Sequence, residues 1–173
     1  MALKSGNLEL FEEEIKTEQD YTSTFADNMS LPVHKWYRYT AGFSAAWVKQ
    51  VIHEERKNGR TNIIDPFAGS GTVLLESEFE NVQAYGVEAH PYVYKIARAK
   101  LNWNYPHETF KYEALRLLAK AKTIKIKTKE YPKLIASCYP LEILEKLEAL
   151  KQAWLKFEQE EDIKIFNWFV ITS

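Results

Sequence analysis

A glycine-containing turn between a short apolar run and a helical pattern constrains the fold of this chain more than any other feature. The run TNIIDPF reaches Asp65, the turn AGSG contains Gly69 and Gly71, and TVLLESEF has helical character from Thr72. Glycines at the carboxyl end of a strand remove side chains, so a ligand can lie directly against the backbone there. We therefore expect a strand over 61–65, a turn and a helix at one crevice of a sheet.

A second strand brings a carboxylate to the same place. VQAYGVEA over 82–89 is predicted to be a strand, and Pro91 is suited to the first turn of the helix that follows. Strand, helix, strand and helix over 61–101 predict the beginning of a parallel sheet with right-handed crossovers. Glu88 then lies beside the glycine turn, where its carboxylate can accept hydrogen bonds from both hydroxyls of a ribose.

Two other types of glycine loop do not fit this turn. A phosphate-binding P-loop requires a lysine directly after its last glycine, whereas Thr72 follows Gly71. The dinucleotide fingerprint GxGxxG would need its third glycine at Leu74. The turn is therefore predicted to bind a nucleoside without a pyrophosphate. The alternative from the residues alone is an ordinary strand-to-helix turn, with Glu88 at a solvated strand end.

Helical spacing of apolar residues is found on both sides of this segment. Upstream, 44–59 is predicted to be a helix that Ser44 caps at its start and Gly59 ends. Downstream we expect helices near 110–121 and over 141–158.

Two further strands are expected in the last part of the chain. One is near 133–138, and the other is the apolar run IKIFNWFVITS over 163–173, which is of the buried-strand type. An apolar strand that ends at the last residue predicts a piece of something longer, with a sheet interrupted after about its fourth strand. The first thirty residues are expected to be a short helix or loop and an irregular arm outside the core. We thus expect an N-terminal arm over 1–30 and one α/β domain over 31–173.

Composition narrows the class of protein. The chain has 173 residues, 46% of them hydrophobic, which suits one globular domain, and its 23 basic and 24 acidic residues nearly cancel. Basic residues are concentrated over 111–133, which can be a DNA-backbone surface or a solvated helix and loop. The single Cys138 cannot form an internal disulfide, no segment approaches the ~18 apolar residues that span a bilayer, and the acidic N-terminus lacks the pattern of a secretory signal. The cytoplasm is therefore the expected location.

The segment DPFAGSGT over 65–72 resembles the first cofactor motif, DPFxGSGT, of the DNA amino-methyltransferases, which make N6-methyladenine or N4-methylcytosine. GVEAHPYVYKIARAKL resembles the strand and helix that follow this motif, and HKWYRYTAGFS resembles the segment that precedes it and closes over the methionine end of the cofactor. Together these segments cover roughly 33–103. The resemblance implies S-adenosylmethionine as cofactor and a Rossmann-like methyltransferase fold, with a mainly parallel sheet and helices on both faces.

The resemblance also implies which residues contact the cofactor. The glycine motif would surround its methionine part, Glu88 would bind its ribose, and Ala89 or His90 would lie beside its adenine. The implied contacts are Phe43, Ser44, Asp65, Phe67, Ala68, Gly69, Ser70, Gly71, Thr72, Glu88, Ala89 and His90.

Several of these residues also have a structural interpretation. Phe67 can be a core residue, Ser44 only a helix cap, and His90 an exposed residue before a proline. An upstream aromatic cluster can be a base-stacking platform or part of the core or an interface. Its members are Trp36, Tyr37 and Tyr39.

No motif for the target amine is found in the sequence. In the family, [DNS]PP[YFW] at the end of the fourth strand accepts hydrogen bonds from the amino group, and its aromatic ring stacks on the flipped base. The nearest string is SCYP over 137–140, which lacks the prolines where they are needed. Either the chain is an N-terminal fragment, or it is a degenerate member that binds cofactor without chemistry.

We therefore expect the S-adenosylmethionine-binding part of a DNA adenine-N6 or cytosine-N4 methylase of restriction-modification type, inactive on its own, with its catalytic residues unidentified and no metal. The expected partners are DNA or RNA, contacted largely through regions outside this chain, and a second subunit or the missing C-terminal part, without a membrane. The alternatives are an RNA methyltransferase of the tRNA guanine-N2 type and a non-catalytic cofactor-binding subunit.

Overall fold

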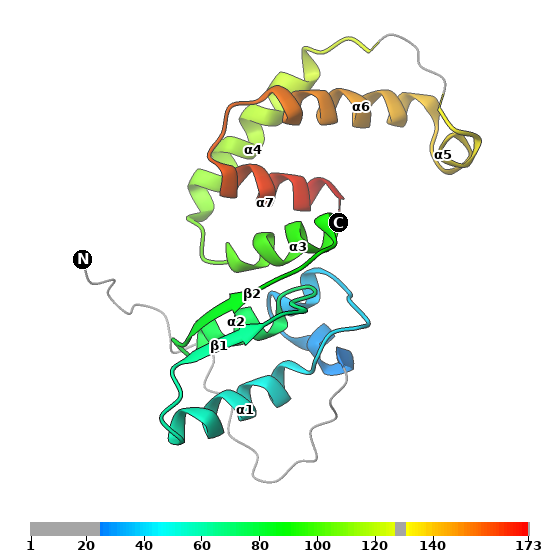
Figure 1. Cartoon of the computed structure of the whole chain (residues 1–173). Helices are drawn as coiled ribbons and strands as arrows, with labels where there is room; N and C mark the ends of the chain where they lie inside the picture. The colour runs from blue at the N-terminus through cyan, green and yellow to red at the C-terminus, as the bar shows by residue number, and fades with distance from the viewer. Residues whose placement is uncertain (1–24, 127–130, 173) are drawn as a thin grey trace.

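The computed structural model describes residues 25–126 and 131–172, which form two lobes (Figure 1). The loop lobe, residues 25–101, contains both strands, and the helical lobe, residues 107–126 and 131–172, contains α4 to α7. The elements are the 3-10 helices η2 (Phe25–Ser30) and η3 (His34–Trp36), the strands β1 (Asn62–Asp65) and β2 (Gln83–Gly86), and the helices α1 (Ala45–Lys57), α2 (Thr72–Phe79), α3 (Pro91–Leu101), α4 (His107–Lys122), α5 (Lys133–Cys138), α6 (Leu141–Lys156) and α7 (Glu161–Thr172).

The two strands pair in parallel, as the sequence predicts. Ile64 lies opposite Tyr85 and Asp65 opposite Gly86. The connecting helix α2 packs on one face of this small sheet and α1 packs on α2. On the other face Ile64, Tyr85 and Val87 are 73%, 56% and 63% exposed. Among the described residues, the sheet is therefore parallel and two-stranded, with one apolar face in contact with solvent.

The predicted ends of α1 are confirmed. The Ser44 side chain accepts a hydrogen bond from the backbone N–H of Trp47, which satisfies one of the free donors at the helix start. Gly59, with φ of +80°, ends the helix in the left-handed conformation that glycine tolerates best. The helix predicted from Pro91 is likewise present as α3.

The strands predicted near 133–138 and over 163–173 are wrong, because residues 133–138 form the helix α5 and residues 163–172 lie in the helix α7. The second segment lies where the helical lobe meets the loop lobe. There Phe169 packs with Ile96 of α3, and Phe166 packs on Phe110 of α4. A helix that is covered on several sides needs apolar residues at nearly every position, so its pattern resembles that of a buried strand. The sheet strands expected there are therefore absent from the part of the chain that the structure describes.

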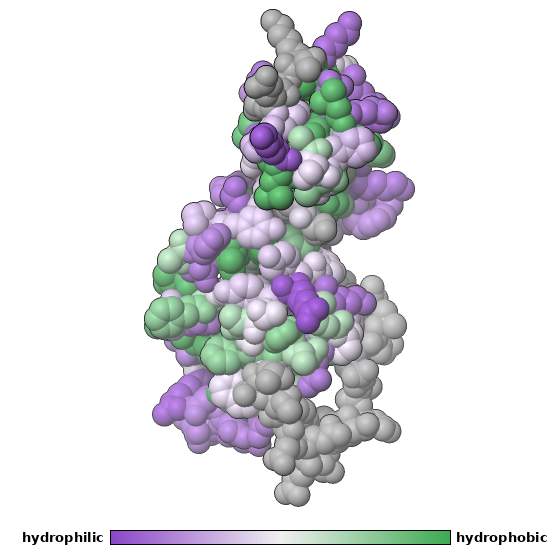
Figure 2. Space-filling view, turned by 90° about the vertical axis from the view of Figure 1, so that its right-hand side faces the viewer, coloured by the Kyte–Doolittle hydropathy of each residue, from purple (hydrophilic) through white to green (hydrophobic). Residues whose placement is uncertain are grey.

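Hydrophobic contacts hold the helical lobe together. Leu117 and Ala121 of α4 pack with Ala153 of α6, and Trp154 and Phe157 cover this cluster. Both helices were predicted from their periodicity and are confirmed. Figure 2 shows a narrowing of the surface between the two lobes, and hydrophobic side chains are exposed on both.

The end of the predicted N-terminal arm is packed more tightly than expected. Residues 1–24 lie outside the described residues. Asn28 of η2 is only 7% exposed, donates to the Phe43 carbonyl at 2.8 Å and accepts from the Ala45 N–H at 2.8 Å. The expectation that this segment stays outside the core is therefore wrong for Asn28, because its amide satisfies backbone groups at the start of α1.

Candidate functional site

The turn after β1 is shaped by the Asp65 side chain and by bonds to the end of β2. The Asp65 carboxylate, 8% exposed, accepts from the Phe67 N–H at 3.0 Å. The Val87 N–H donates to the Asp65 carbonyl, and the Ala68 N–H donates to the Val87 carbonyl, both at 2.9 Å. These bonds bring the glycine loop, defined as residues 65–72, to the carboxyl ends of both strands.

Both loop glycines have backbone angles that other residues adopt at a cost. Gly69 has φ of +53° and Gly71, the N-cap of α2, has φ of +85°. A Cβ at Gly69 would lie 2.8 Å from Cε1 of Tyr39, and one at Gly71 would lie 3.1 Å from Cβ of Ala97. Contacts with neighbouring side chains therefore already account for a glycine at both positions, whether or not a ligand also lies there.

The Glu88 carboxylate joins the two strand ends. Its Oε2 accepts from the Gly69 N–H at 2.9 Å and its Oε1 accepts from the His90 N–H at 2.7 Å. The juxtaposition that the sequence predicts, an acid beside the glycines, is present. Because each carboxylate oxygen can accept two hydrogen bonds, each keeps capacity for a further donor such as a ligand hydroxyl.

Two cavities flank this site and differ greatly in size. The smaller, about 20 Å³, lies between Tyr39 and the glycine loop. The larger, about 450 Å³, lies among α2, β2 and α3. Its lining combines apolar side chains with two tyrosines and three charged residues, Glu78, Glu88 and Arg98. Since pockets for small organic ligands measure roughly 300–1,000 Å³, only the larger one can hold a nucleoside in this conformation.

The other residues implied as contacts lie around the loop with different exposure. Phe67 is 86% exposed, so the alternative that it is a core residue is wrong. Phe43 is also exposed and packs on Trp47 at 5.3 Å between ring centroids. Ser44 is buried as a helix cap. Ala68, Ser70 and Thr72 are buried, and Ala89 and His90 are exposed.

Two of the three upstream aromatic residues are partly buried and pack against the core. Trp36 stacks on Phe166 of α7 at 5.6 Å, and Tyr37 meets Tyr92 of α3 at 6.1 Å. The interpretation as core or interface therefore holds for Trp36 and Tyr37. Tyr39 instead lies over Gly69.

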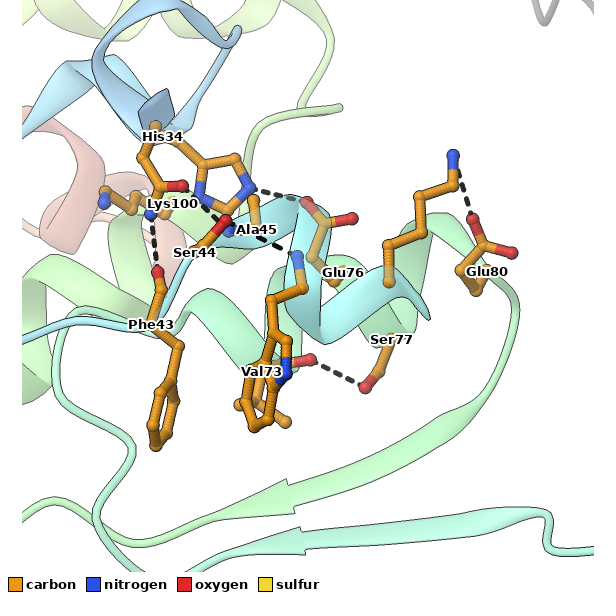
Figure 3. Close-up of polar contacts among 12 residues, drawn as sticks. His34, Phe43, Ser44, Ala45, Val73, Glu76, Ser77, Glu80 and Lys100 are labelled. Carbon is orange, nitrogen blue, oxygen red and sulfur yellow. Dashed lines mark hydrogen bonds and ion pairs between the residues drawn. The ribbon is translucent and has the colours of Figure 1, made fainter. Parts of the chain in front are cut away.

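Two buried polar contacts near the loop were missed by sequence reasoning. His34 Nε2 lies 2.7 Å from Oε1 of Glu76, with the residues only 3% and 6% exposed (Figure 3). Lys100, 2% exposed, donates to the Ser70 hydroxyl at 3.5 Å, and burial lowers the pKa of its amine to about 8. The only signal in the sequence is a charged residue directly between apolar or small residues. These residues are Glu76 in LLESEF and Lys100 in ARAKL.

The segments considered for DNA lie in the helical lobe. The string SCYP begins with the last two residues of α5 and ends at Pro140, directly before α6. The Ser137 hydroxyl donates to the Leu134 carbonyl at 2.8 Å. Figure 1 shows α5 at the far end of this lobe from β1 and β2. Within the basic stretch, Arg116 is paired with Glu113 at 2.7 Å, whereas Lys127 and Lys129 lie outside the described residues.

Two curated methyltransferases resemble part of this chain. Type II methyltransferase M.AvaI of Nostoc sp. strain PCC 7120 is 40% identical over 68 residues, which are 39% of this chain and 14% of that protein. M.BsoBI of Geobacillus stearothermophilus is 32% identical over 79 residues, 46% of this chain and 16% of that protein. The matched region thus spans less than a fifth of these curated relatives. No solved structure matches.

No helix among the described residues is long and apolar enough to cross a membrane.

The model of one protein family matches more than half of the chain. The matched residues, 7–99, include the glycine loop, Glu88 and most of α3. The curated relatives described above are type II methyltransferases. The chain belongs to the DNA methylase family.

Proposed function

We propose that this chain binds S-adenosylmethionine at the glycine loop and Glu88, as the cofactor-binding part of a DNA adenine-N6 or cytosine-N4 methylase. The observation that carries this proposal is the carboxylate of Glu88, hydrogen-bonded to the Gly69 N–H where two parallel strands end. This is the crevice in which parallel sheets bind nucleosides.

Glu88 accepts hydrogen bonds from the ribose hydroxyls with the capacity left on its two oxygens. The 450 Å³ cavity that Glu88 lines has room for the adenosine half, with Ala89 or His90 beside the adenine. The methionine half lies along residues 65–72, near Phe43 and Ser44. Because the Tyr39 ring fills the space over Gly69, this ring moves aside when the methionine half binds.

When bound, the cofactor supplies a methyl group on a sulfonium, and the protein contributes binding and placement. Transfer also requires groups that hold the target amine in line with this methyl. The sequence has no [DNS]PP[YFW] motif, and its nearest string lies in the helical lobe, away from the loop. The chain alone is therefore expected to bind cofactor without methylating DNA.

A larger Rossmann-like sheet is the second part of the proposal. The N–H and C=O of Val87 both bond toward β1, so those of Gly86 face the open edge of β2, because these directions alternate along a strand. One sheet face also leaves Ile64 and Tyr85 exposed. Further strands would pair with the open edge of β2, and a covering layer would bury the exposed face. Both would come from the rest of a longer protein or from a second subunit that also contacts DNA.

Calorimetry with S-adenosylhomocysteine tests the cofactor site. The unsubstituted chain should bind, and Glu88→Gln should lose about 10- to 100-fold in affinity because a charge-assisted bond is worth roughly 1.5–3 kcal/mol. Glu108→Gln, which changes an exposed glutamate in α4, is the matched control and should bind as the unsubstituted chain does. Absence of binding by the unsubstituted chain would overturn the proposal, and full affinity in Glu88→Gln would remove Glu88 from the ribose site.

Incubation with tritiated S-adenosylmethionine and mixed-sequence DNA tests the expected inactivity. An active type II methyltransferase serves as the positive control. Label transferred by this chain at a comparable rate would show that it contains a complete catalytic site.

A further inference from the structure

A buried amine lies against the glycine loop without a charged partner. Lys100, in the last turn of α3, is 2% exposed, and its Nζ lies 3.5 Å from the neutral hydroxyl of Ser70. Ser70 directly precedes Gly71, the N-cap of α2. Across residues 25–126 and 131–172, no carboxylate lies within ion-pair distance of this amine.

Such a lysine lowers stability rather than raising it. Taking an ammonium group out of water without a counter-charge costs several kcal/mol, and an apolar residue of similar volume is often more stable at a buried charged position. The pKa of about 8 leaves the amine mostly charged near neutral pH. A purely structural role therefore accounts poorly for a charge at this position.

The surroundings of Lys100 add to its positive potential. The N-terminus of α2 carries the positive end of the helix dipole, and Gly71 provides no side-chain cap for its free N–H groups. Both the helix end and the lysine act on the same loop, Lys100 through Ser70 in a region shielded from water. A negatively charged group bound on this loop would compensate both the charge of Lys100 and the positive end of the α2 dipole.

We propose that Lys100 is a positioning residue whose buried charge favours ligands with a carboxylate on the glycine loop. This inference rests on the proposed function, in which the ligand is S-adenosylmethionine and the carboxylate belongs to its methionine half. Lys100 acts through the loop, holding Ser70 by a hydrogen bond and supplying the charge that the loop backbone alone lacks.

The test compares two ligands that differ only in the carboxylate, S-adenosylmethionine and decarboxylated S-adenosylmethionine, by calorimetry on the whole chain near pH 7. The unsubstituted chain should prefer the carboxylate by about tenfold, the size of one charge-assisted interaction. Lys100→Met should reduce this preference to less than about twofold while its melting temperature stays equal or rises, because the buried charge is gone. Lys111→Met removes one exposed lysine from α4 and is the control for net charge, which should keep the full preference.

Lys100→Gln separates charge from hydrogen bonding. Gln keeps a donor for Ser70 but no charge, so it should also lose the preference for the carboxylate. A preference that persists in both variants, or that persists in Lys100→Gln alone, would overturn the inference and leave the cofactor site intact. No binding of either ligand by the unsubstituted chain would overturn the proposed function, and this inference with it.

Discussion

The two lobes differ in what they bury. Of the buried polar side chains in the described residues, only Asn167 belongs to the helical lobe, whereas the loop lobe buries His34, Glu76 and Lys100 among others. The helical core of Leu117 and its neighbours is apolar. Buried polar groups and left-handed glycines cost stability unless their partners are in place, and they gather where a ligand is bound. This difference supports the proposal that the loop lobe binds the ligand, whereas the helical lobe is held together by apolar packing.

The largest expected effect on stability distinguishes a buried from an exposed histidine–glutamate pair within the loop lobe. His34→Ala leaves the Glu76 carboxylate buried without a partner and should lower the free energy of unfolding by about 3–5 kcal/mol. His53→Ala is the matched control, since His53 pairs with Glu80 at the surface, and it should cost less than about 1 kcal/mol. Urea unfolding measures both, and equal effects would show that burial of the His34 pair has no special weight.

A change in the helical lobe should affect stability alone. Leu117→Ala removes a side chain that is 2% exposed and should cost about 2–4 kcal/mol. Its neighbour Leu118, 44% exposed, gives the control Leu118→Ala, expected to cost about 0.5 kcal/mol or less. The folded Leu117→Ala protein should bind S-adenosylhomocysteine with unchanged affinity. A loss of affinity in it would break the division of roles between the lobes.

The loop glycine Gly71 should tolerate a methyl group less well than a glycine of similar backbone angle elsewhere. Gly71→Ala forces a Cβ to 3.1 Å from Ala97 at φ of +85°, and should cost about 2–3 kcal/mol. Gly59→Ala has φ of +80° with nothing within 4 Å, and should cost about 1 kcal/mol. The difference in thermal unfolding isolates the contact with α3. If both variants lose the same amount, this contact does not constrain Gly71.

The smallest expected effect is the pH dependence that Lys100 adds. Its pKa of about 8 lies below the ordinary lysine value, so the unfolded state binds more protons above pH 8 and stability rises with pH. From pH 8 to 9.5 the unfolding free energy of the unsubstituted chain should rise by about 1–2 kcal/mol relative to Lys100→Met. Tyr92, Tyr105 and Tyr131, whose pKa values are raised from 10.0, act in the opposite sense mainly above this window and in both proteins alike. Parallel curves for the two proteins would contradict a buried charged amine.

Local patterns predicted the structure around the glycine loop better than that of the rest of the chain. Strand, turn and helix from 61 to 79 follow from adjacent residues, and the parallel order of strands then brings Glu88 to the glycines without further information. The apolar run over 163–173 contains no glycine or proline to mark a turn. Because the helix is buried on several sides, its apolar pattern resembles that of a strand. Among the described residues the one sheet is formed by β1 and β2, and residues 133–138 form the short helix α5.

The missed contacts depend on residues far apart in the chain. His34 and Glu76 are 42 positions apart, and Ser70 and Lys100 are 30 apart. Helical or strand periodicity cannot pair such residues, because only the packing of η3 and α3 against α2 brings them together. The exposure of Phe67 likewise depends on how the loop projects from the sheet, which the motif does not specify.

The most direct test of the central claim is a crystal structure of the chain with S-adenosylhomocysteine. We predict electron density at the carboxyl ends of β1 and β2, with the ribose hydroxyls within hydrogen-bond distance of the Glu88 carboxylate and the Tyr39 ring displaced from Gly69. Density for the ligand elsewhere on the sheet or in the helical lobe, with the loop and Glu88 unchanged, would contradict the account.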